Sequence, residues 1–313
     1  MDVNEAPEQE LPRKPELVSS GNNLLKTLLS LALYIGVYYI FFRQNLEWIL
    51  LLVLVIVFHE MGHFIAMKAF GYNDVKMFFV PFLGAFVSGE PQKISQFQRA
   101  ITLLAGPVPG IILGLIFFWL QSKTGNQVYH WLAFMLLVLN GINLLPVSPL
   151  DGGQLLENVF FHSNRIVQSI FIILSIIILF YAGVATRNYF LLIIIYLLIV
   201  RFRYLASIDS VRKNLESDGI SYQKSYSDLS DEEYRSIRTV MIQHIRALRN
   251  VDPEYEDSDE ADVGGYLKNV LTAPFESDLS NWQKLVVILV WLFSLLLPVI
   301  LYLGYAYKNL TIV

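Results

Sequence analysis

The chain has 313 residues, of which 55% are apolar and only 16% are charged. A soluble domain carries about 25% charged residues, so this composition argues against an ordinary soluble protein. The formal net charge is −4. The chain has no cysteine, and this excludes disulfides and thiolate metal sites.

The apolar residues are gathered in long segments that contain no Asp, Glu, Lys or Arg. A helix needs about 20 mostly apolar residues to cross the core of a bilayer. A soluble protein would need several helices that are apolar on every face, and such helices are typical of membrane spans. We therefore expect an all-α polytopic membrane protein with six or seven transmembrane helices, at residues 24–42, 46–67, 100–120, 128–149, 166–184 and 284–306, with a shorter apolar run at 188–200 as the seventh.

The segment before the first span, residues 1–23, is a polar tail without the basic start and apolar centre of a secretory signal. Residues 24–45 are therefore expected to act as an uncleaved first anchor. Lys and Arg gather on one side of the membrane if the N-terminus is cytoplasmic and the spans alternate, which favours that orientation. The residues after 203 lie on the cytoplasmic side only if the run at 188–200 crosses the bilayer.

Residues 75–89, between the second and third spans, mix β-forming residues with turn residues. Non-helical backbone at membrane depth is stable only when it is buried or lines a cavity. The segment is typical of a short β-hairpin or a re-entrant loop, and we expect a small membrane-associated β-hairpin.

The second span ends in His59-Glu60-Met61-Gly62-His63. Residues four apart share one face of a helix, so both imidazoles can reach one ion, and zinc accepts neutral histidine nitrogens. Glu60 is close enough to accept a proton from a water at that ion. A charged side chain in a span costs ~2.5–3.5 kcal/mol on insertion scales, so such residues usually mark function. A polar helix end without metal is the alternative interpretation of this motif.

The fourth span ends in a second motif, Pro149-Leu150-Asp151-Gly152-Gly153. A catalytic zinc site has three protein ligands and one open position, and Asp151 can supply the third ligand. Pro-Leu-Asp-Gly-Gly is also favourable turn chemistry, so a simple turn is the alternative. The third and fourth spans cross the membrane and return, which places Asp151 on the same side as the histidine motif. The two motifs together favour a metal site.

The later part of the chain is predicted to contain a transmembrane helical hairpin at 166–203, a soluble acidic and partly helical loop domain at 204–281, and a C-terminal transmembrane helix at 282–313. Ser230 and Glu233 match a capping box at the start of a helix over 230–249. Apolar positions and one histidine recur there at helical spacing: Ile237, Met241, His244, Ile245 and Leu248.

The acidic run at 252–262 has two interpretations. One is a site for a cation or a basic partner, and the other, which we favour, is a solvated linker, because the spacing of the carboxylates does not fit a calcium loop.

The motifs together resemble the site-2 protease family of intramembrane zinc metalloproteases. The resemblance covers residues 46–165, a three-helix core with the hairpin. It rests on the sequences His59-Glu60-Met61-Gly62-His63, Ala105-Gly106-Pro107, Pro81-Phe82-Leu83-Gly84, and Asn143-x-x-Pro146 followed by Leu150-Asp151-Gly152. The chain departs from some members in having no recognisable PDZ-like insert or paired CBS modules.

The resemblance implies one Zn²⁺ per chain held by His59, His63 and Asp151, with Glu60 as the general base. It also implies that Asn143 contacts the substrate or stabilises the oxyanion. The implied reaction is hydrolysis of peptide bonds within or near transmembrane segments of membrane-anchored proteins, either regulators or remnants of signal peptides, as in regulated intramembrane proteolysis.

The implied partners are the lipid bilayer and a membrane-anchored protein substrate, without nucleic acid. The absence of cysteine and the short loops between the spans favour a bacterial inner membrane as the location. We expect an unwound substrate segment to pair with an edge of the hairpin, as peptides do with other sheets. Two alternatives are a non-catalytic zinc-binding membrane scaffold and a transporter. A transporter would spread its polar residues over several spans, whereas here they gather around one place.

Overall fold

The computed structural model describes residues 11–16, 23–42, 46–81, 84–91, 93–161, 165–187, 190–252 and 260–310. The chain forms two compact units. The larger unit contains Asn22–Ile195 and Phe275–Val313, and the smaller one combines the described N-terminal residues 11–16 with Tyr196–Pro274. The division between the units falls within one long helix, α8 (Phe190–Ser217).

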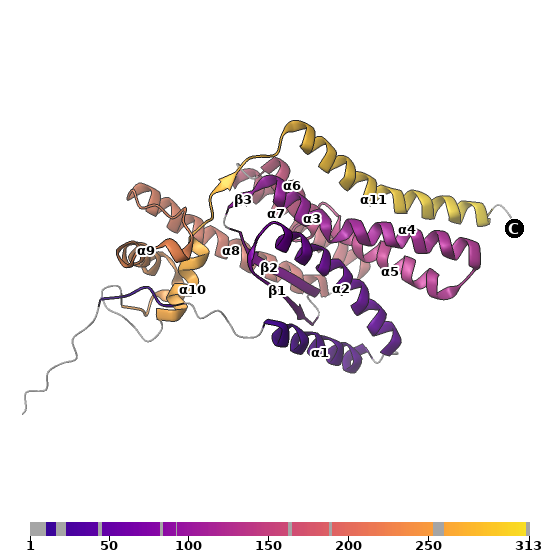
Figure 1. The fold of residues 1–313 in the computed structure, drawn as a ribbon, viewed down its shortest axis with the longest axis horizontal. Coiled ribbons are helices and arrows are strands. Elements are labelled where there is room, and N and C mark those ends of the chain that lie inside the picture. The colour runs from indigo at the N-terminus through magenta and orange to yellow at the C-terminus, as the bar shows by residue number, and fades with distance from the viewer. Residues whose placement is uncertain are drawn as a thin grey trace, which may run out of the picture. The chain divides into compact units, whose positions relative to one another are not determined.

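The larger unit is mainly helical, with two small sheets (Figure 1). In chain order its elements are α1 (Asn23–Phe42), α2 (Leu46–Ala69), β1 (Asn73–Val80), β2 (Gly84–Glu90), β3 (Ile94–Ser95), α3 (Gln96–Ala105), α4 (Pro107–Thr124), α5 (Gln127–Asn143), α6 (Asp151–Leu156), a π-helix at Glu157–Phe161, α7 (Arg165–Thr186), the start of α8, β4 (Phe275–Glu276) and α11 (Asn281–Leu310).

Among the described residues, 5 helical segments are long and apolar enough to cross a membrane: Leu46–Ala69, Gln96–Thr124, Ile166–Ala185, Leu191–Ser217 and Asn281–Gly304. A shorter apolar helix covers Leu24–Ile40. Large apolar side chains such as Leu54, Ile177 and Phe293 are exposed along these helices. A bilayer rather than water suits such surfaces, because exposed apolar patches of this extent are rare on soluble proteins. The predicted all-α polytopic membrane fold is confirmed.

The predicted ends of two membrane spans are wrong. The span expected at 128–149 ends as a helix at Asn143, because Pro146 and Pro149 lack the amide proton that a continuing helix needs. The described residues of the run expected at 188–200 form the beginning of α8, which starts at Phe190 and continues to Ser217. The charged residues after position 200 suggested an end, but no helix-breaking residue follows before Gly219, which adopts a φ of 70°.

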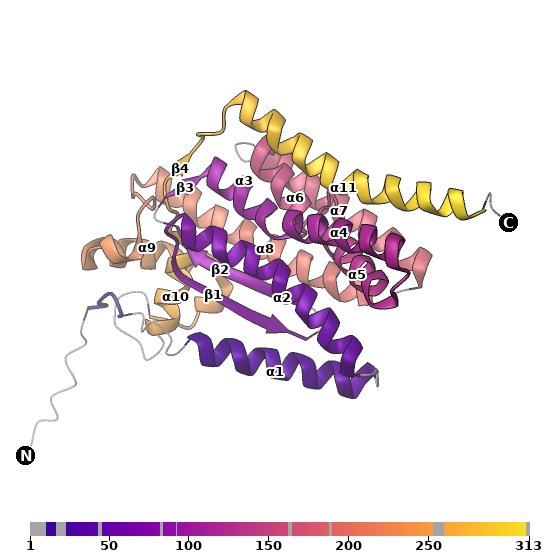
Figure 2. The same ribbon diagram turned by 45° about the vertical axis from the view of Figure 1, so that its right-hand side comes forward.

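The hairpin predicted at 75–89 is confirmed, since β1 and β2 pair antiparallel with Met77 opposite Val87 and Phe79 opposite Ala85. Residues 82–83 of its expected turn lie outside the described part of the chain. The hairpin packs beside α1 and α2 (Figure 2), where Met77 and Phe79 share a buried apolar cluster with Tyr34 of α1 and Val53 of α2.

The outer edge of β1 is hydrogen-bonded to α1. The Thr27 hydroxyl donates to the Met77 carbonyl at 2.5 Å, and the Phe79 amide donates to Ser30 Oγ at 3.1 Å. These hydroxyls satisfy polar backbone groups that would otherwise be costly to leave unpaired at a sheet edge.

A second, two-stranded parallel sheet joins β3 to β4 and so connects the segment before α11 to the start of α3. Asp278 accepts hydrogen bonds from the Ser95 hydroxyl at 2.5 Å and from the Phe97 amide at 3.0 Å. Burial alone would raise the pKa of Asp278, but these hydrogen bonds outweigh burial and hold that pKa below its usual range. The C-terminal helix is thereby anchored to the helix that follows the hairpin.

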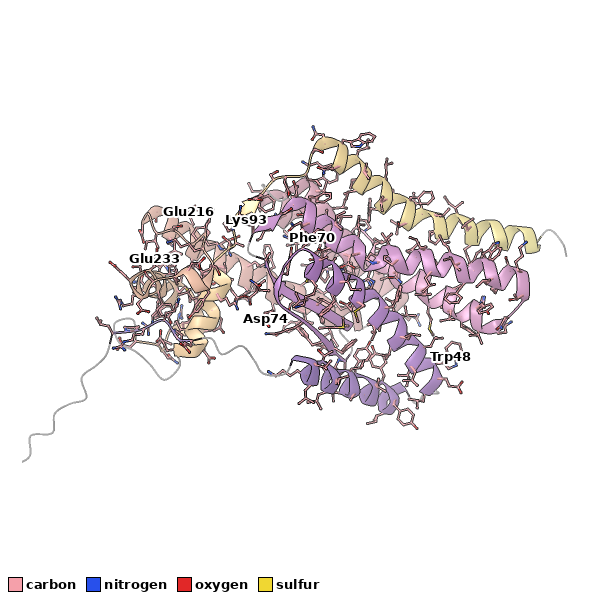
Figure 3. All side chains as sticks on the ribbon, viewed as in Figure 1. Trp48, Phe70, Asp74, Lys93, Glu216 and Glu233 are labelled. Atoms are coloured by element: carbon pink, nitrogen blue, oxygen red, sulfur yellow. The ribbon has the colours of Figure 1, made fainter. Side chains whose placement is uncertain are left out.

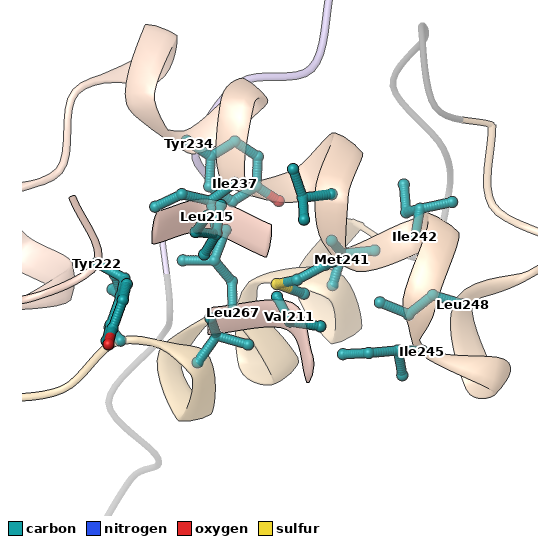
Figure 4. Packing of buried hydrophobic residues seen from close by; sticks show 14 of the residues in the cluster. Val211, Leu215, Tyr222, Tyr234, Ile237, Met241, Ile242, Ile245, Leu248 and Leu267 are labelled. Carbon is teal, nitrogen blue, oxygen red and sulfur yellow. The ribbon is translucent and has the colours of Figure 1, made fainter. Parts of the chain in front are cut away.

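The smaller unit packs α9 (Asp231–His244), α10 (Glu260–Val270) and the end of α8 around an apolar core, with 3₁₀ turns at Tyr226–Asp228 and Arg246–Leu248. Ile237, Met241 and Leu267 are fully buried in this core (Figure 4). Residues 11–16 of the N-terminal tail belong to this unit through hydrogen bonds. The Lys14 ammonium, for example, donates to the Leu229 carbonyl at 2.7 Å.

The predicted capping box is confirmed, because Ser230 and Glu233 bond reciprocally at the start of α9. The helix expected through residue 249 is wrong, since α9 ends at His244 and Ile245 is extended. Ile245 and Leu248 are nevertheless buried, while His244 is exposed and does not belong to the apolar face.

Glu260, within the acidic run at 252–262, is an internal ion-pair partner rather than a solvated residue. Its two carboxylate oxygens lie 2.8 Å from Nε and 2.9 Å from Nη2 of Arg238, whose side chain is completely buried. The Tyr234 hydroxyl donates to the same carboxylate. A bidentate, fully hydrogen-bonded pair is the form in which buried charges are tolerated. Residues 253–259 of the run lie outside the described chain.

Candidate metal centre

The structure brings the three predicted metal ligands together. His59 and His63 lie on one face of α2, with 3% and 7% of their surface exposed, and Asp151 is the first residue of α6. Asp151 Oδ2 lies 3.1 Å from His59 Nε2 and 3.2 Å from His63 Nε2. The two Nε2 atoms are 3.2 Å apart. In Figure 3 the labelled Trp48 lies near the start of α2 and the labelled Phe70 directly follows its end, so the helix that carries His59 and His63 runs between these two labels.

Each histidine uses its other ring nitrogen to bond away from the group. His63 Nδ1 is 2.8 Å from the Thr102 backbone carbonyl, and His59 Nδ1 is 2.8 Å from Asn140 Oδ1. A carbonyl oxygen can only accept, so both Nδ1 atoms carry a proton when the rings are neutral. Both Nε2 atoms then present lone pairs towards Asp151.

This arrangement fits a metal cation. With no proton on either Nε2, Asp151 Oδ2 is buried without a hydrogen-bond donor among the described residues. Three electron-pair donors therefore converge within 4.8 Å of one another. A buried carboxylate oxygen without a partner is costly, and two neutral imidazoles with one carboxylate are a ligand set that zinc accepts.

Glu60 is buried beside the group on α2, with 8% of its surface exposed. It interacts electrostatically with His59, His63 and Asp151. A carboxylate so close to the group, yet not one of the three converging ligands, is available to handle a proton.

The loop between α5 and α6 places Asp151. The Leu144 carbonyl accepts from the Trp291 indole at 2.8 Å, and the Ser148 amide donates to Ser175 Oγ at 3.1 Å. The loop is thus held by α11 and α7. A Cβ at Gly152 would overlap the Leu144 carbonyl, and one at Gly153 would overlap the backbone of Val147. Close backbone packing therefore requires glycine at positions 152 and 153.

Two further glycines of the predicted motifs allow close packing at the histidines. A Cβ on Gly62 would overlap the Ala105 carbonyl oxygen, and one on Gly106 would overlap the His63 ring. Gly106 lies at the break between α3 and α4, where Pro107 begins the next helix. The junction of α3 and α4, which carries the Ala105-Gly106-Pro107 motif, can therefore lie directly against the face of α2 that carries His63.

Asn143 is the half-buried last residue of α5, and its role towards substrate stays a prediction. Asn140, one turn earlier, was not predicted from the sequence but is completely buried and hydrogen-bonded to His59. A buried amide in an otherwise apolar span was the signal that could have identified it.

Comparison with known proteins supports the predicted resemblance. Residues 47–126 match the sequence profile of peptidase family M50. Zinc metalloprotease MJ0392 of Methanocaldococcus jannaschii is 23% identical over 219 residues, which cover 64% of this chain and 63% of that protein. Stage IV sporulation protein FB of Bacillus subtilis is 29% identical over 118 residues, covering 37% of this chain and 41% of that protein.

The solved structure of a site-2 protease from Methanocaldococcus jannaschii matches 56% of this chain and 84% of that chain, with 22% identity and a TM-score of 0.41. The chain spans less than two thirds of the length of the curated relatives above. The resemblance to the site-2 protease family is confirmed by the profile and by the sequence relatives.

Proposed function

We propose that this protein is an intramembrane zinc metalloendopeptidase. The observation that carries the proposal is the convergence of three side chains beside the buried carboxylate of Glu60. His59 and His63 lie on a helix long enough to cross a membrane, and Asp151 begins the short helix α6. A family profile and relatives named as zinc metalloproteases support the same chemistry.

His59 Nε2, His63 Nε2 and Asp151 Oδ2 would hold one Zn²⁺ per chain. When bound, zinc polarises the scissile carbonyl and makes a water acidic enough to attack near neutral pH. The Nδ1 protons of the histidines keep both Nε2 lone pairs turned towards the ion. The apolar side chains of the surrounding helices exclude bulk water, which strengthens these electrostatic interactions.

Glu60 is proposed to take the proton from the attacking water and deliver it to the nitrogen of the leaving amine. Its position on α2, one residue from His59 and three from His63, keeps the carboxylate next to the reacting atoms. A non-catalytic zinc scaffold would have no use for a buried carboxylate outside the ligand set, because burying it costs free energy. Asn143 is proposed to contact the substrate backbone or the oxyanion.

The substrate is proposed to be a membrane-anchored protein whose helix unwinds near the site, because a helical carbonyl is occupied by its intrahelical hydrogen bond. We place the protein in the lipid bilayer with a cytoplasmic N-terminus, in a bacterial inner membrane. The substrate class is a regulator or a remnant signal peptide, in keeping with regulated intramembrane proteolysis.

The unwound segment is proposed to pair with the edge of β2 rather than of β1. Met77 and Phe79 of β1 direct their backbone groups towards α1, so their antiparallel partners Val87 and Ala85 direct theirs to the opposite edge. Among the described residues, none forms a hydrogen bond with the backbone of Ala85 or Val87 at that edge. Since α1 occupies the outer edge of β1, the edge of β2 is the one open to strand addition.

Replacing Val87 with Pro should therefore weaken cleavage about 2- to 13-fold, the equivalent of one net hydrogen bond of ~0.5–1.5 kcal/mol. Proline removes the amide that points away from β1, and proline is tolerated at such edge positions. The matched control is Val87→Ala, which shortens the side chain but keeps the amide. Equal cleavage rates of a membrane-anchored reporter by the two variants would remove the edge of β2 from substrate binding.

The proposed function as a whole is tested by removing and restoring the metal. The purified full-length protein should contain near one zinc per chain and should cleave a membrane-anchored reporter in vesicles. Stripping by a chelator should abolish cleavage, and stoichiometric zinc should restore it. Cleavage that continues after the zinc has been removed would contradict the proposal, and zinc-loaded protein that cleaves no member of a panel of anchored reporters would favour the scaffold.

A further inference from the structure

Asn140 lies in the middle of a buried hydrogen-bond chain that ends at His59. Its side chain has no exposed surface. Asn140 Nδ2 donates to the Leu136 carbonyl of the preceding turn at 2.7 Å, while Oδ1 lies 2.8 Å from His59 Nδ1. α5 thus reaches across to α2 through one amide group.

The orientation of this amide follows from its partners. The Leu136 carbonyl can only accept, so the NH₂ group must face it, and the amide oxygen must face His59. Because the oxygen can only accept, His59 Nδ1 must carry the proton. The lone pair of His59 is then at Nε2, which is the atom that lies 3.1 Å from Asp151 Oδ2.

We propose that Asn140 is a positioning residue that fixes the tautomer and ring orientation of His59 for metal binding, an inference that rests on the proposed function. His63 receives the same constraint from the Thr102 backbone carbonyl. A substitution at position 140 can remove the acceptor of the His59 Nδ1 proton. The acceptor of the His63 Nδ1 proton is a backbone carbonyl, which no side-chain substitution removes. A histidine ligand commonly donates its other ring N–H to such a partner, and loss of the partner typically lowers metal affinity 10- to 100-fold.

Gly110 of α4 provides the space in which Asn140 lies. A Cβ at Gly110 would overlap Nδ2, Cγ and Oδ1 of Asn140, and these are its three nearest atoms. A methyl group at position 110 should therefore displace the Asn140 amide without touching a ligand. Gly141 is a matched control, because a Cβ there meets nothing within 4 Å and position 141 adjoins Asn140 on α5.

The test measures the zinc dissociation constant of the purified full-length protein by competition with a chelating dye. Asn140→Leu, which has similar volume but no acceptor, should weaken zinc binding 10- to 100-fold. Asn140→Asp, which keeps an acceptor for the Nδ1 proton, should bind zinc within about threefold of the wild type, or more tightly, because a carboxylate partner also raises ligand basicity. Equal weakening by both variants would assign Asn140 a packing role and overturn the proposal.

Gly110→Ala should weaken zinc binding in the wild-type background but have little further effect when combined with Asn140→Ala, since the group it displaces is then gone. Gly141→Ala should leave the affinity unchanged. Additive effects of Gly110→Ala and Asn140→Ala would show that Gly110 does not act through Asn140.

A spectroscopic measurement checks the tautomer directly. In zinc-free protein labelled with ¹⁵N-histidine, the His59 signals, identified by their loss in His59→Gln, should report a proton on Nδ1. In Asn140→Leu they should shift towards a mixture of tautomers, and an unchanged spectrum would overturn the inference. If His59→Gln itself retains wild-type zinc affinity, the proposed metal centre fails. If only Asn140→Leu retains it, the positioning role alone fails.

Discussion

Replacing Glu60 with Gln is expected to abolish peptide cleavage while leaving zinc near one per chain. Gln has nearly the same shape as Glu but cannot accept the proton of the attacking water. General acid–base catalysis typically contributes about 10²–10⁴-fold to a rate. The cleavage rate of Glu60→Gln should therefore fall by about 10²-fold or more. Glu60 is outside the group formed by His59, His63 and Asp151, which is why zinc should remain bound.

The measurement is zinc content by elemental analysis, side by side with single-turnover cleavage of an anchored reporter. Met61→Leu is the matched control, because Met61 is exposed on the same helix and the exchange conserves volume. A fully active Glu60→Gln protein would remove Glu60 from the proton transfer. Loss of zinc in that variant would instead indicate that the carboxylate belongs to the ligand set.

Replacing Asp151 with Ala should remove zinc together with cleavage. Asp151 Oδ2 is the atom that both Nε2 atoms approach, at 3.1 and 3.2 Å. Loss of an outer partner of a metal ligand costs about 10- to 100-fold in affinity, and loss of a direct ligand should exceed that range. Without this carboxylate, two neutral imidazoles would be the only predicted ligands left, and neither carries a charge that compensates that of a divalent cation.

Zinc affinity of Asp151→Ala is measured by the same dye competition as for the Asn140 variants. Asp262→Ala is the control, since it removes an exposed carboxylate of the smaller unit. An Asp151→Ala protein that binds zinc as the wild type does would exclude Asp151 as a ligand and would favour the interpretation of 149–153 as a simple turn. The expected loss of zinc in Asp151→Ala, together with retained zinc in Glu60→Gln, would separate the metal-binding step from the proton-transfer step.

The proposed site depends on parts of the chain beyond the segment that matches the family profile, residues 47–126. Asp151 lies in a loop held by Trp291 of α11 and Ser175 of α7. The segment before α11 is in turn bonded to the start of α3 through Asp278. The C-terminal helix therefore helps to hold the loop that carries Asp151 in the proposed metal centre, although it supplies none of the predicted ligands.

The class of fold and the three residues that meet could be predicted from the amino-acid sequence. Long uncharged segments predict membrane helices because a bilayer tolerates no exposed backbone polar groups and few charges. The four-residue spacing of His59 and His63 places them on one helix face whatever surrounds them. Asp151 was identifiable because the third and fourth predicted spans cross the membrane and return, which predicts that it lies on the same side as the histidine motif.

The groups that surround the predicted ligands, and the residues at which the helices end, became evident only from the three-dimensional packing. Asn140 and the Thr102 carbonyl are far from His59 and His63 in sequence, so no local pattern could pair them. The edge of β1 is occupied because α1 packs against it, a contact between elements that periodicity does not encode. Charges after residue 200 suggested the end of a span, but backbone hydrogen bonding continues until glycine interrupts it, so α8 runs on into the smaller unit.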